Sequence, residues 1–153
     1  MTNLTKKIIE TTTGVDALPL RVITGGIFFA HGAQKLFGWF GGYGLKGTAN
    51  WMASIGLEPS VLLTVLAGGA EFFGGLLLIL GLLVRPTALV LAVTMLVAIF
   101  SVHISNGFFI SNNGYEFALA LLVINIALFI RGAGSFSIDQ ILQQKLFTQT
   151  SKA

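Results

Sequence analysis

Long apolar stretches alternate along this chain with short polar or glycine-rich segments. About 20 consecutive apolar residues form a helix long enough to cross the ~30 Å hydrocarbon core of a bilayer. Four stretches approach or exceed this length, and they cover residues 18–40, 61–84, 86–104 and 115–130. The pattern predicts an all-α fold, an integral membrane four-helix bundle in which residues 1–153 form a single transmembrane domain.

The connecting segments differ in character. Residues 41–60 are rich in glycine and predict an external loop with a short helix that Thr48 caps and Gly56 ends. Trp39, Tyr43 and Trp51 are typical of the headgroup region of a membrane. This loop is either a lid over the bundle or an aromatic anchor.

Two further connections are predicted from local sequence. The pair Arg85-Pro86 predicts a tight turn between the second and third stretches, with Pro86 in the first turn of the next helix. Residues 135–146 predict a C-terminal interfacial helix, with Ile138, Ile141, Leu142 and Leu146 on one face and Asp139, Gln140, Gln143 and Gln144 on the other.

Composition excludes a soluble domain. Hydrophobic residues make up 54% of the chain, charged residues only 10%, and the mean hydropathy is +0.86. The nine Lys and Arg residues form no cluster, so the net charge of +3 does not indicate nucleic acid. With no cysteine, the chain forms no disulfide and supplies no thiolate to a cluster.

The basic residues instead indicate orientation. If four helices span, both termini lie on one side, because the number of crossings is even. The terminal side and the turn at Arg85 hold Lys6, Lys7, Arg21, Arg85, Arg131, Lys145 and Lys152, whereas the other side holds Lys35 and Lys46. The positive-inside rule therefore predicts cytoplasmic N- and C-termini, with Arg21 reaching the interface along its own stem.

Glu71 is the most informative residue, because a carboxylate within an apolar span is costly and is a functional-site hypothesis by default. Gly68, Gly74 and Gly75 share its helical face, so a neighbouring helix can approach closely. At ~1.5 Å of rise per residue, His31 and Glu71 both lie within ~3 Å of the bilayer midplane, on its outer side. Lys35, Glu116 and His103 lie ~9 to ~12 Å outside it.

These depths predict an outward-facing polar pocket. His31 and Glu71 would be hydrogen-bonded at its bottom as the catalytic pair, exchanging a proton with a quinone or another small ligand. Lys35 and Glu116 would pair near the mouth, and the ligand-binding candidates are Gln34, Lys35, His103 and Glu116. Alternatively, the same groups are satisfied pairs that only specify helix packing.

Other chemistry is disfavoured. A bis-histidine haem would need histidines at one depth, whereas His31 and His103 differ by ~9 Å. A zinc or di-iron centre needs more His or carboxylate ligands than the outer half offers, so no metal is expected. Asn125 faces away from Glu116 and is expected to make an interhelical hydrogen bond.

Three groups of residues, together spanning roughly Leu18 to Asp139, carry a family resemblance: Gly32-Ala33-Gln34-Lys35-Leu36-Phe37, Gly69-Ala70-Glu71-Phe72-Phe73-Gly74-Gly75 with Gly81 and Arg85, and Gly114-Tyr115-Glu116-Phe117-Ala118-Leu119 with Gly132-Ala133-Gly134-Ser135-Phe136-Ser137-Ile138-Asp139. With them the chain resembles the DoxX family of small four-helix membrane proteins of bacteria. The family is named after a subunit associated with quinone-linked sulfur oxidation, and its members are commonly labelled oxidoreductases. The resemblance implies the bacterial inner (plasma) membrane and places Lys35, Glu71 and Glu116 in the family pattern.

Three functions follow as expectations. The first is a subunit of a quinone-linked membrane oxidoreductase, working in the lipid bilayer with a membrane or soluble redox partner, or as a homo-oligomer. The second is a membrane scaffold or assembly factor without catalytic activity. The third, a small-solute carrier, is disfavoured because the four stretches show no inverted repeat and no broken helix at the midplane.

Overall fold

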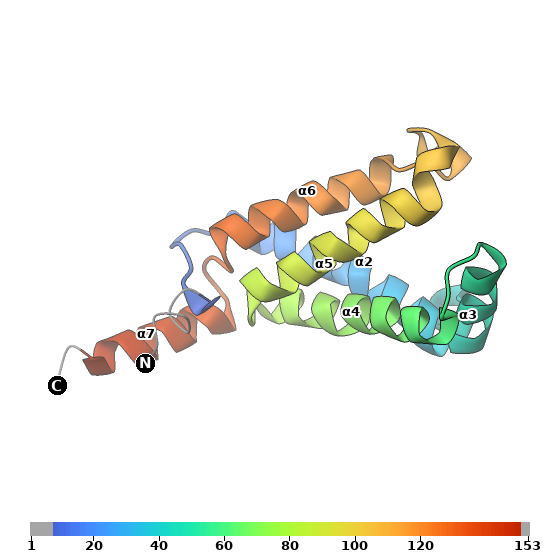
Figure 1. The fold of residues 1–153 in the computed structure, drawn as a ribbon. Helices are drawn as coiled ribbons and strands as arrows, with labels where there is room; N and C mark the ends of the chain where they lie inside the picture. Colours follow the sequence, from blue (N-terminus) through green and yellow to red (C-terminus); the bar gives the residue numbers. More distant parts are fainter. Residues whose placement is uncertain (1–7, 151–153) are drawn as a thin grey trace.

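The structure, a computed structural model, describes residues 8–150. This part of the chain contains six α-helices and no strand, so the all-α prediction is confirmed (Figure 1). The helices are α2 (Ala17–Phe37), α3 (Gly44–Ser54), α4 (Ser60–Leu80), α5 (Val84–Ala98), α6 (Glu116–Arg131) and α7 (Ile138–Thr150). Short helical turns join them: η1 (Trp39–Gly41), η2 (Ile99–His103), η3 (Ile104–Asn106) and η4 (Ile110–Asn112).

Four of the helices form two antiparallel pairs. α2 packs mainly along α4, and α5 packs mainly along α6. In Figure 1 the pairs lie close together where α7 leaves them and diverge where α3 and the turns η2 to η4 lie. We call these two ends the α7 end and the α3 end.

Residues in the left-handed backbone region decide where two helices stop. α2 ends at Phe37 because Gly38 has φ 74°, and α4 ends at Leu80 because Gly81 has φ 66°. Leu83, with φ 51°, completes the turn, and α5 begins at Val84. The hairpin therefore precedes the predicted Arg85-Pro86 turn, although Pro86 does lie in the first turn of α5.

Glycines bring α2 against α4 on both sides of Glu71. A Cβ atom on Gly25 would lie 2.7 Å from the carbonyl oxygen of Gly75, and one on Gly68 would lie 2.8 Å from the Leu36 side chain. The predicted close approach of a neighbouring helix is thus confirmed for these positions, and the neighbour is α2. Gly74 instead faces α5, where Leu91 fills the space beside it.

Within residues 8–150, two helical segments are long and apolar enough to cross a membrane. They are α4, Ser60–Leu80, and the run Val84–Asn106, which comprises α5 with η2 and η3. Their outward faces carry exposed aliphatic side chains, among them Val65 and Leu66 on α4 and Val93 on α5. Large exposed Leu and Val side chains on such helices are suited to contact with lipid.

The prediction that Arg21 reaches the membrane interface was wrong. Its side chain does not extend to an interface, because the residue is only 1% exposed. Its guanidinium donates hydrogen bonds to the carbonyls of Leu78 and Ile79 at the end of α4, and to those of Ser135 and Phe136. A helix C-terminus leaves carbonyls without intrahelical partners, and a cation there also complements the helix dipole.

The prediction that Asp139 lies on the polar face of the C-terminal helix was also wrong. Asp139 belongs to the buried face of α7 and is 2% exposed. Its carboxylate accepts hydrogen bonds from the backbone N–H groups of Leu83 (2.8 Å) and Val84 (3.0 Å), which begin α5. Burial raises the pKa of Asp139, while these two donors and nearby Arg21 oppose that rise. Ile141, predicted on the apolar face of this helix, is 51% exposed.

The segment before α2 is tied to the end of α6 and to the connection that follows it. Gly14 and Ser135 exchange hydrogen bonds through Ser135 N–H to Gly14 O and Gly14 N–H to Ser135 Oγ, and the Arg131 guanidinium pairs with Asp16 at 2.6 Å. Lys6, Lys7 and Lys152, used to predict orientation, lie outside the described residues.

Asn125 is buried, but its side chain donates a hydrogen bond within α6, to the carbonyl of Leu121. The prediction of an interhelical hydrogen bond from Asn125 was therefore wrong.

Candidate ligand-binding site

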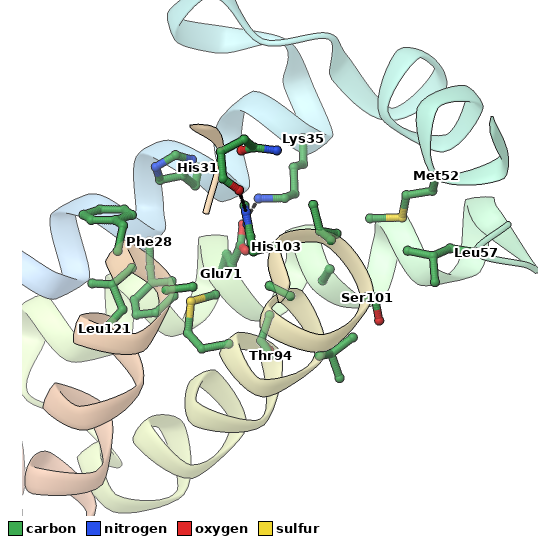
Figure 2. Close-up of a pocket in the computed structure, with 18 of the residues that line it drawn as sticks. Phe28, His31, Lys35, Met52, Leu57, Glu71, Thr94, Ser101, His103 and Leu121 are labelled. Atoms are coloured by element: carbon green, nitrogen blue, oxygen red, sulfur yellow. Dashed lines mark hydrogen bonds and ion pairs between the residues drawn. The ribbon is translucent and has the colours of Figure 1, made fainter. Parts of the chain in front are cut away.

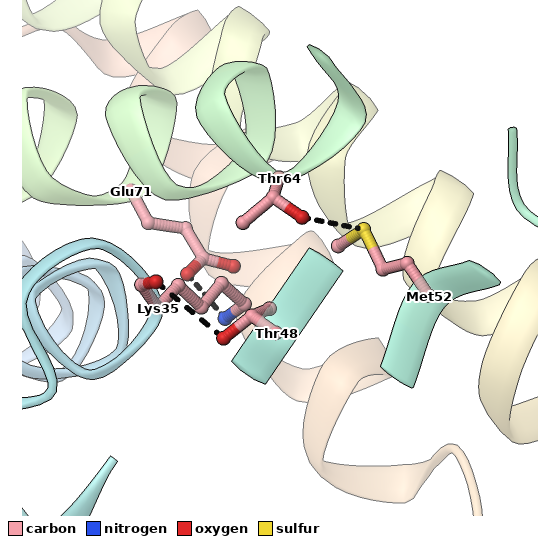
Figure 3. A network of polar contacts seen from close by, with 5 residues as sticks. All are labelled: Lys35, Thr48, Met52, Thr64 and Glu71. Atoms are coloured by element: carbon pink, nitrogen blue, oxygen red, sulfur yellow. Dashed lines mark hydrogen bonds and ion pairs between the residues drawn. The ribbon is translucent and has the colours of Figure 1, made fainter. Parts of the chain in front are cut away.

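An ion pair between α2 and α4 lies at the centre of the candidate site. Lys35 Nζ is 2.5 Å from Glu71 Oε2 (Figure 3). The Glu71 side chain is 5% exposed and the Lys35 side chain 25%. The carboxylate is thus almost completely removed from solvent, whereas its cationic partner retains some access to it.

The direction of the side chains explains this pairing, which differs from the predicted one. Side chains of an α-helix lean toward its N-terminus. In antiparallel α2 and α4, Lys35 therefore leans toward the α7 end and Glu71 toward the α3 end, so the two meet. The prediction compared only the depths of the Cα atoms along each helix, and it wrongly paired His31 with Glu71 and Lys35 with Glu116.

His31 lies one helical turn before Lys35 and has a different environment. Its ring is tilted against that of Phe117 on α6, with centroids 6.4 Å apart. Among the described residues no hydrogen bond joins His31 to Glu71. His31 nevertheless remains beside the pair and lines the same cavity.

This cavity, about 520 Å³ in volume, lies between the two helix pairs on the α3 side (Figure 2). Lys35, Glu71, His31 and His103 supply its ionisable groups. Most of the remaining wall is apolar and comes from every surrounding helix, including Phe28, Trp51, Met52, Ala67, Met95, Val97, Ala98, Phe117, Ala118 and Leu121. The predicted polar pocket is thus a mainly apolar cavity that carries a small polar group of side chains.

A second cavity of about 690 Å³ lies next to the first, and we call it the vestibule. The two share His31, Lys35, Trp51 and Asn113, and the vestibule is also lined by Gln34 and the glycine-rich segment 41–47. Lys35 therefore contacts both spaces, so the ion pair lies where they meet.

α3 covers the α3 end of the site and is fastened to both neighbouring helices (Figure 3). Thr48 Oγ1 donates to the Lys35 carbonyl at 3.4 Å, and buried Thr64 Oγ1 lies 3.3 Å from Met52 Sδ. α3 begins at Gly44, so Thr48 lies inside the helix and is not its cap. The segment predicted as a lid or an anchor contains a docked helix.

The other predicted ligand-binding residues shape the loops around the cavities. Gln34 Nε2 donates to the Phe40 carbonyl at 3.2 Å, and His103 Nδ1 lies 2.8 Å from the Asn113 carbonyl. Glu116 Oε1 accepts from Ile110 N–H at 2.6 Å and thereby ties η4 to the start of α6. Gln34 faces the vestibule and His103 faces the first cavity, whereas Glu116 acts on the loop.

His103 also ends the five-residue π-helical turn η2, whose last three residues line the cavity. Such turns are rare and occur frequently at functional sites, because they rotate side chains relative to a regular helix. Nothing in the hydropathy pattern marks this turn. The apolar wall residues Phe28, Met95 and Leu121 were also missed, since helix-spaced apolar residues look the same whether they fill a core or line a cavity.

These features define a class: a small, all-helical membrane protein with a ligand-sized cavity between its helices. The chain belongs to the DoxX family, whose model, described as DoxX, matches residues 17–104. The matched segment includes α2, α3, α4 and α5, and with them Lys35 and Glu71.

Curated relatives extend over most of the chain. An uncharacterized protein of Haemophilus influenzae is 32% identical over 140 residues, covering 86% of each chain. A Bacillus subtilis protein named "Putative oxidoreductase CatD" is 38% identical over 114 residues, covering 74% of this chain and 78% of its own. The Escherichia coli "Inner membrane protein YqjF" is 34% identical, covering 86% and 95%. No solved structure matches the chain.

Proposed function

We propose that this protein is the quinone-binding subunit of an oxidoreductase in the bacterial inner membrane. The observation that carries the proposal is the joining of a mainly apolar cavity to the buried Lys35–Glu71 pair. A quinone has an apolar ring edge and chain, and two carbonyl oxygens that accept hydrogen bonds. The relatives named as an oxidoreductase and as an inner membrane protein support the class of function and its location.

The proposed membrane arrangement has four spans, α2, α4, α5 with η2, and α6, in one transmembrane domain. Arg85, Arg131 and Lys145 lie in or near the α7 end, whereas Lys46 lies on α3. This distribution supports cytoplasmic termini, an orientation in which the cavity would lie in the outer half of the bilayer.

Orientation is testable because the chain has no native cysteine. We expect Tyr43→Cys, at a residue 85% exposed, to react with a membrane-impermeant thiol reagent in intact cells. Lys145→Cys should react only after permeabilisation. The reverse pattern would contradict the proposed orientation.

In the proposed reaction, Lys35 Nζ donates a hydrogen bond to one quinone oxygen. Reduction to the quinol takes two electrons, which a redox partner subunit supplies, and two protons, both of which enter from water in the vestibule. Glu71, unprotonated in its pair with Lys35, takes up one proton and passes it to the reduced quinone oxygen that Lys35 binds, and the second quinone oxygen takes the other proton from water. His31, which borders both cavities, lies on the route of these protons.

The test is the quinone content of the purified protein. Solvent extraction followed by mass spectrometry should recover quinone from wild type and from Lys46→Met, a control on an exposed lysine. It should recover far less from Lys35→Met/Glu71→Gln, which removes both charges together. Equal recovery from all three proteins would refute the assignment of the site.

A second candidate function, a non-catalytic scaffold, is favoured by one observation. The Lys35–Glu71 pair is already satisfied within the chain, which is what a purely structural contact requires. A Glu71→Gln protein that folds normally and preserves all cellular function would support this role over the redox one.

A further inference from the structure

We infer that the cavity opens sideways between α4 and α5, and that this opening holds the hydrocarbon chain of the quinone. The inference rests on the proposed function and adds the route by which a membrane-dissolved ligand reaches the Lys35–Glu71 pair. The separation of α4 from α5 along their length is the first observation that supports it.

Near their hairpin the two helices are in contact. A Cβ atom on Gly74 would lie 3.2 Å from the Leu91 side chain, and Leu91 is fully buried. Two helical turns farther from the hairpin, the corresponding residues are Ala67 on α4 and Ala98 on α5. Both of these line the cavity, so the helices have separated there and small side chains leave the space open.

The opening reaches the outer surface of the protein. Val97 lines the cavity and is also 56% exposed, as a residue at the mouth of an opening would be. Ser101, one turn farther, likewise lines the cavity and is exposed. In Figure 2, Met52 of α3 lies beside Leu57, on the same side of the view as Ser101.

Two other sides of the cavity are closed, and a third leads to the vestibule. The glycine contacts seal α2 against α4, and α5 packs closely along α6. Between α2 and α6, Phe28 and Leu121 are buried, but His31 and Phe117 are exposed and His31 also lines the vestibule. The α2–α6 side therefore leads into the vestibule with its polar groups, whereas the gap between α4 and α5 leads to an exposed apolar face.

The chemistry of this gap suits a hydrocarbon chain. Its rim consists of Ala67, Val97 and Ala98, with Ser101 at the outer end and Thr94, whose hydroxyl donates to the Val90 carbonyl at 3.0 Å. The wall thus offers methyl groups, whereas the polar groups are concentrated deeper, at Lys35 and Glu71. A ligand arriving from water through the vestibule would gain nothing from such a rim, whereas an alkyl chain can lie along it in van der Waals contact.

The experiment compares two quinones that share a head group, one with a decyl chain and one with no chain. Ala67→Phe and Ala98→Phe fill the gap from opposite sides, and Leu66→Phe and Val93→Phe place the same side chain on the exposed faces of α4 and α5. We expect the first two variants to weaken binding of the decyl quinone by about tenfold, because the new phenyl ring takes the space of part of the chain. Their affinity for the chainless quinone should be unchanged, which also shows that they are folded, and both controls should bind both quinones as wild type does.

Unchanged decyl quinone affinity in both gap variants, or an equal loss for both quinones, would overturn the sideways opening. Failure of the wild-type protein to bind either quinone would instead refute the proposed function itself.

Discussion

Removing Lys35 while retaining Glu71 tests the energetic importance of the ion pair. In Lys35→Met the Glu71 side chain, 5% exposed, has lost its cation. Folding with an unpaired buried carboxylate costs about 3–5 kcal/mol. The variant can avoid this by folding with Glu71 protonated, which costs ~1.4 kcal/mol for each pH unit above a reference pKa of ~4.3, or nearly 4 kcal/mol at pH 7.

The expected loss in free energy of unfolding is therefore about 3–4 kcal/mol at pH 7, and it should shrink by ~1.4 kcal/mol for each pH unit as the pH falls toward 4.5. Lys35→Met/Glu71→Gln should recover most of the loss, because no charge is then buried alone. Unfolding in mixed micelles with increasing SDS, followed by tryptophan fluorescence, measures these values, and Lys46→Met is the matched control. A loss below ~1 kcal/mol at pH 7, or one that does not change with pH, would refute this reasoning.

Two further stability predictions use the same assay. Asp139→Ala leaves two N–H groups at the start of α5 without their acceptor and should lower the free energy of unfolding by about 2–3 kcal/mol. Its control, Asp16→Ala, removes an exposed ion pair and should cost less than ~1 kcal/mol. Equal losses in the two variants would contradict the assigned role of Asp139. Gly75→Ala places a methyl group 2.5 Å from the Gly25 carbonyl and should cost about 1–3 kcal/mol, whereas Gly69→Ala meets nothing within 4 Å and should be neutral or stabilising. A neutral Gly75→Ala would mean that α2 and α4 are not in close contact.

Much of the helical layout could be predicted from hydropathy, and the errors have local causes. The four long apolar stretches located α2, α4, α5 and α6 to within a few residues. The ends shifted where Gly38 and Gly81 adopt left-handed backbone conformations, which hydropathy does not register. Arg21 and Asp139 were placed at a surface because a single charged residue near a helix end is usually solvated, and their partners lie more than 50 residues away.

The residues that line the candidate site could be predicted better than the contacts they make with each other. His31, Lys35, Glu71 and His103 do line one cavity, because a polar face in an apolar helix must turn inward. Their pairing depends on the lean of each side chain, and an estimate from rise per residue leaves this out. The cavity itself arises from the divergence of the two helix pairs, a property of packing that no single stretch of sequence contains.

The most direct test of quinone binding uses the two tryptophans. Trp51 lines the cavity, whereas Trp39 packs against Phe37 outside it, and their exposures are similar, 43% and 51%. With only Trp51 present, in Trp39→Phe, titration with decyl quinone should quench fluorescence saturably, and adding Lys35→Met/Glu71→Gln should abolish saturation. With only Trp39 present, in Trp51→Phe, quenching should be weak and linear. Equal quenching of both tryptophans, or saturable quenching of Trp51 without the ion pair, would contradict quinone binding at Lys35 and Glu71.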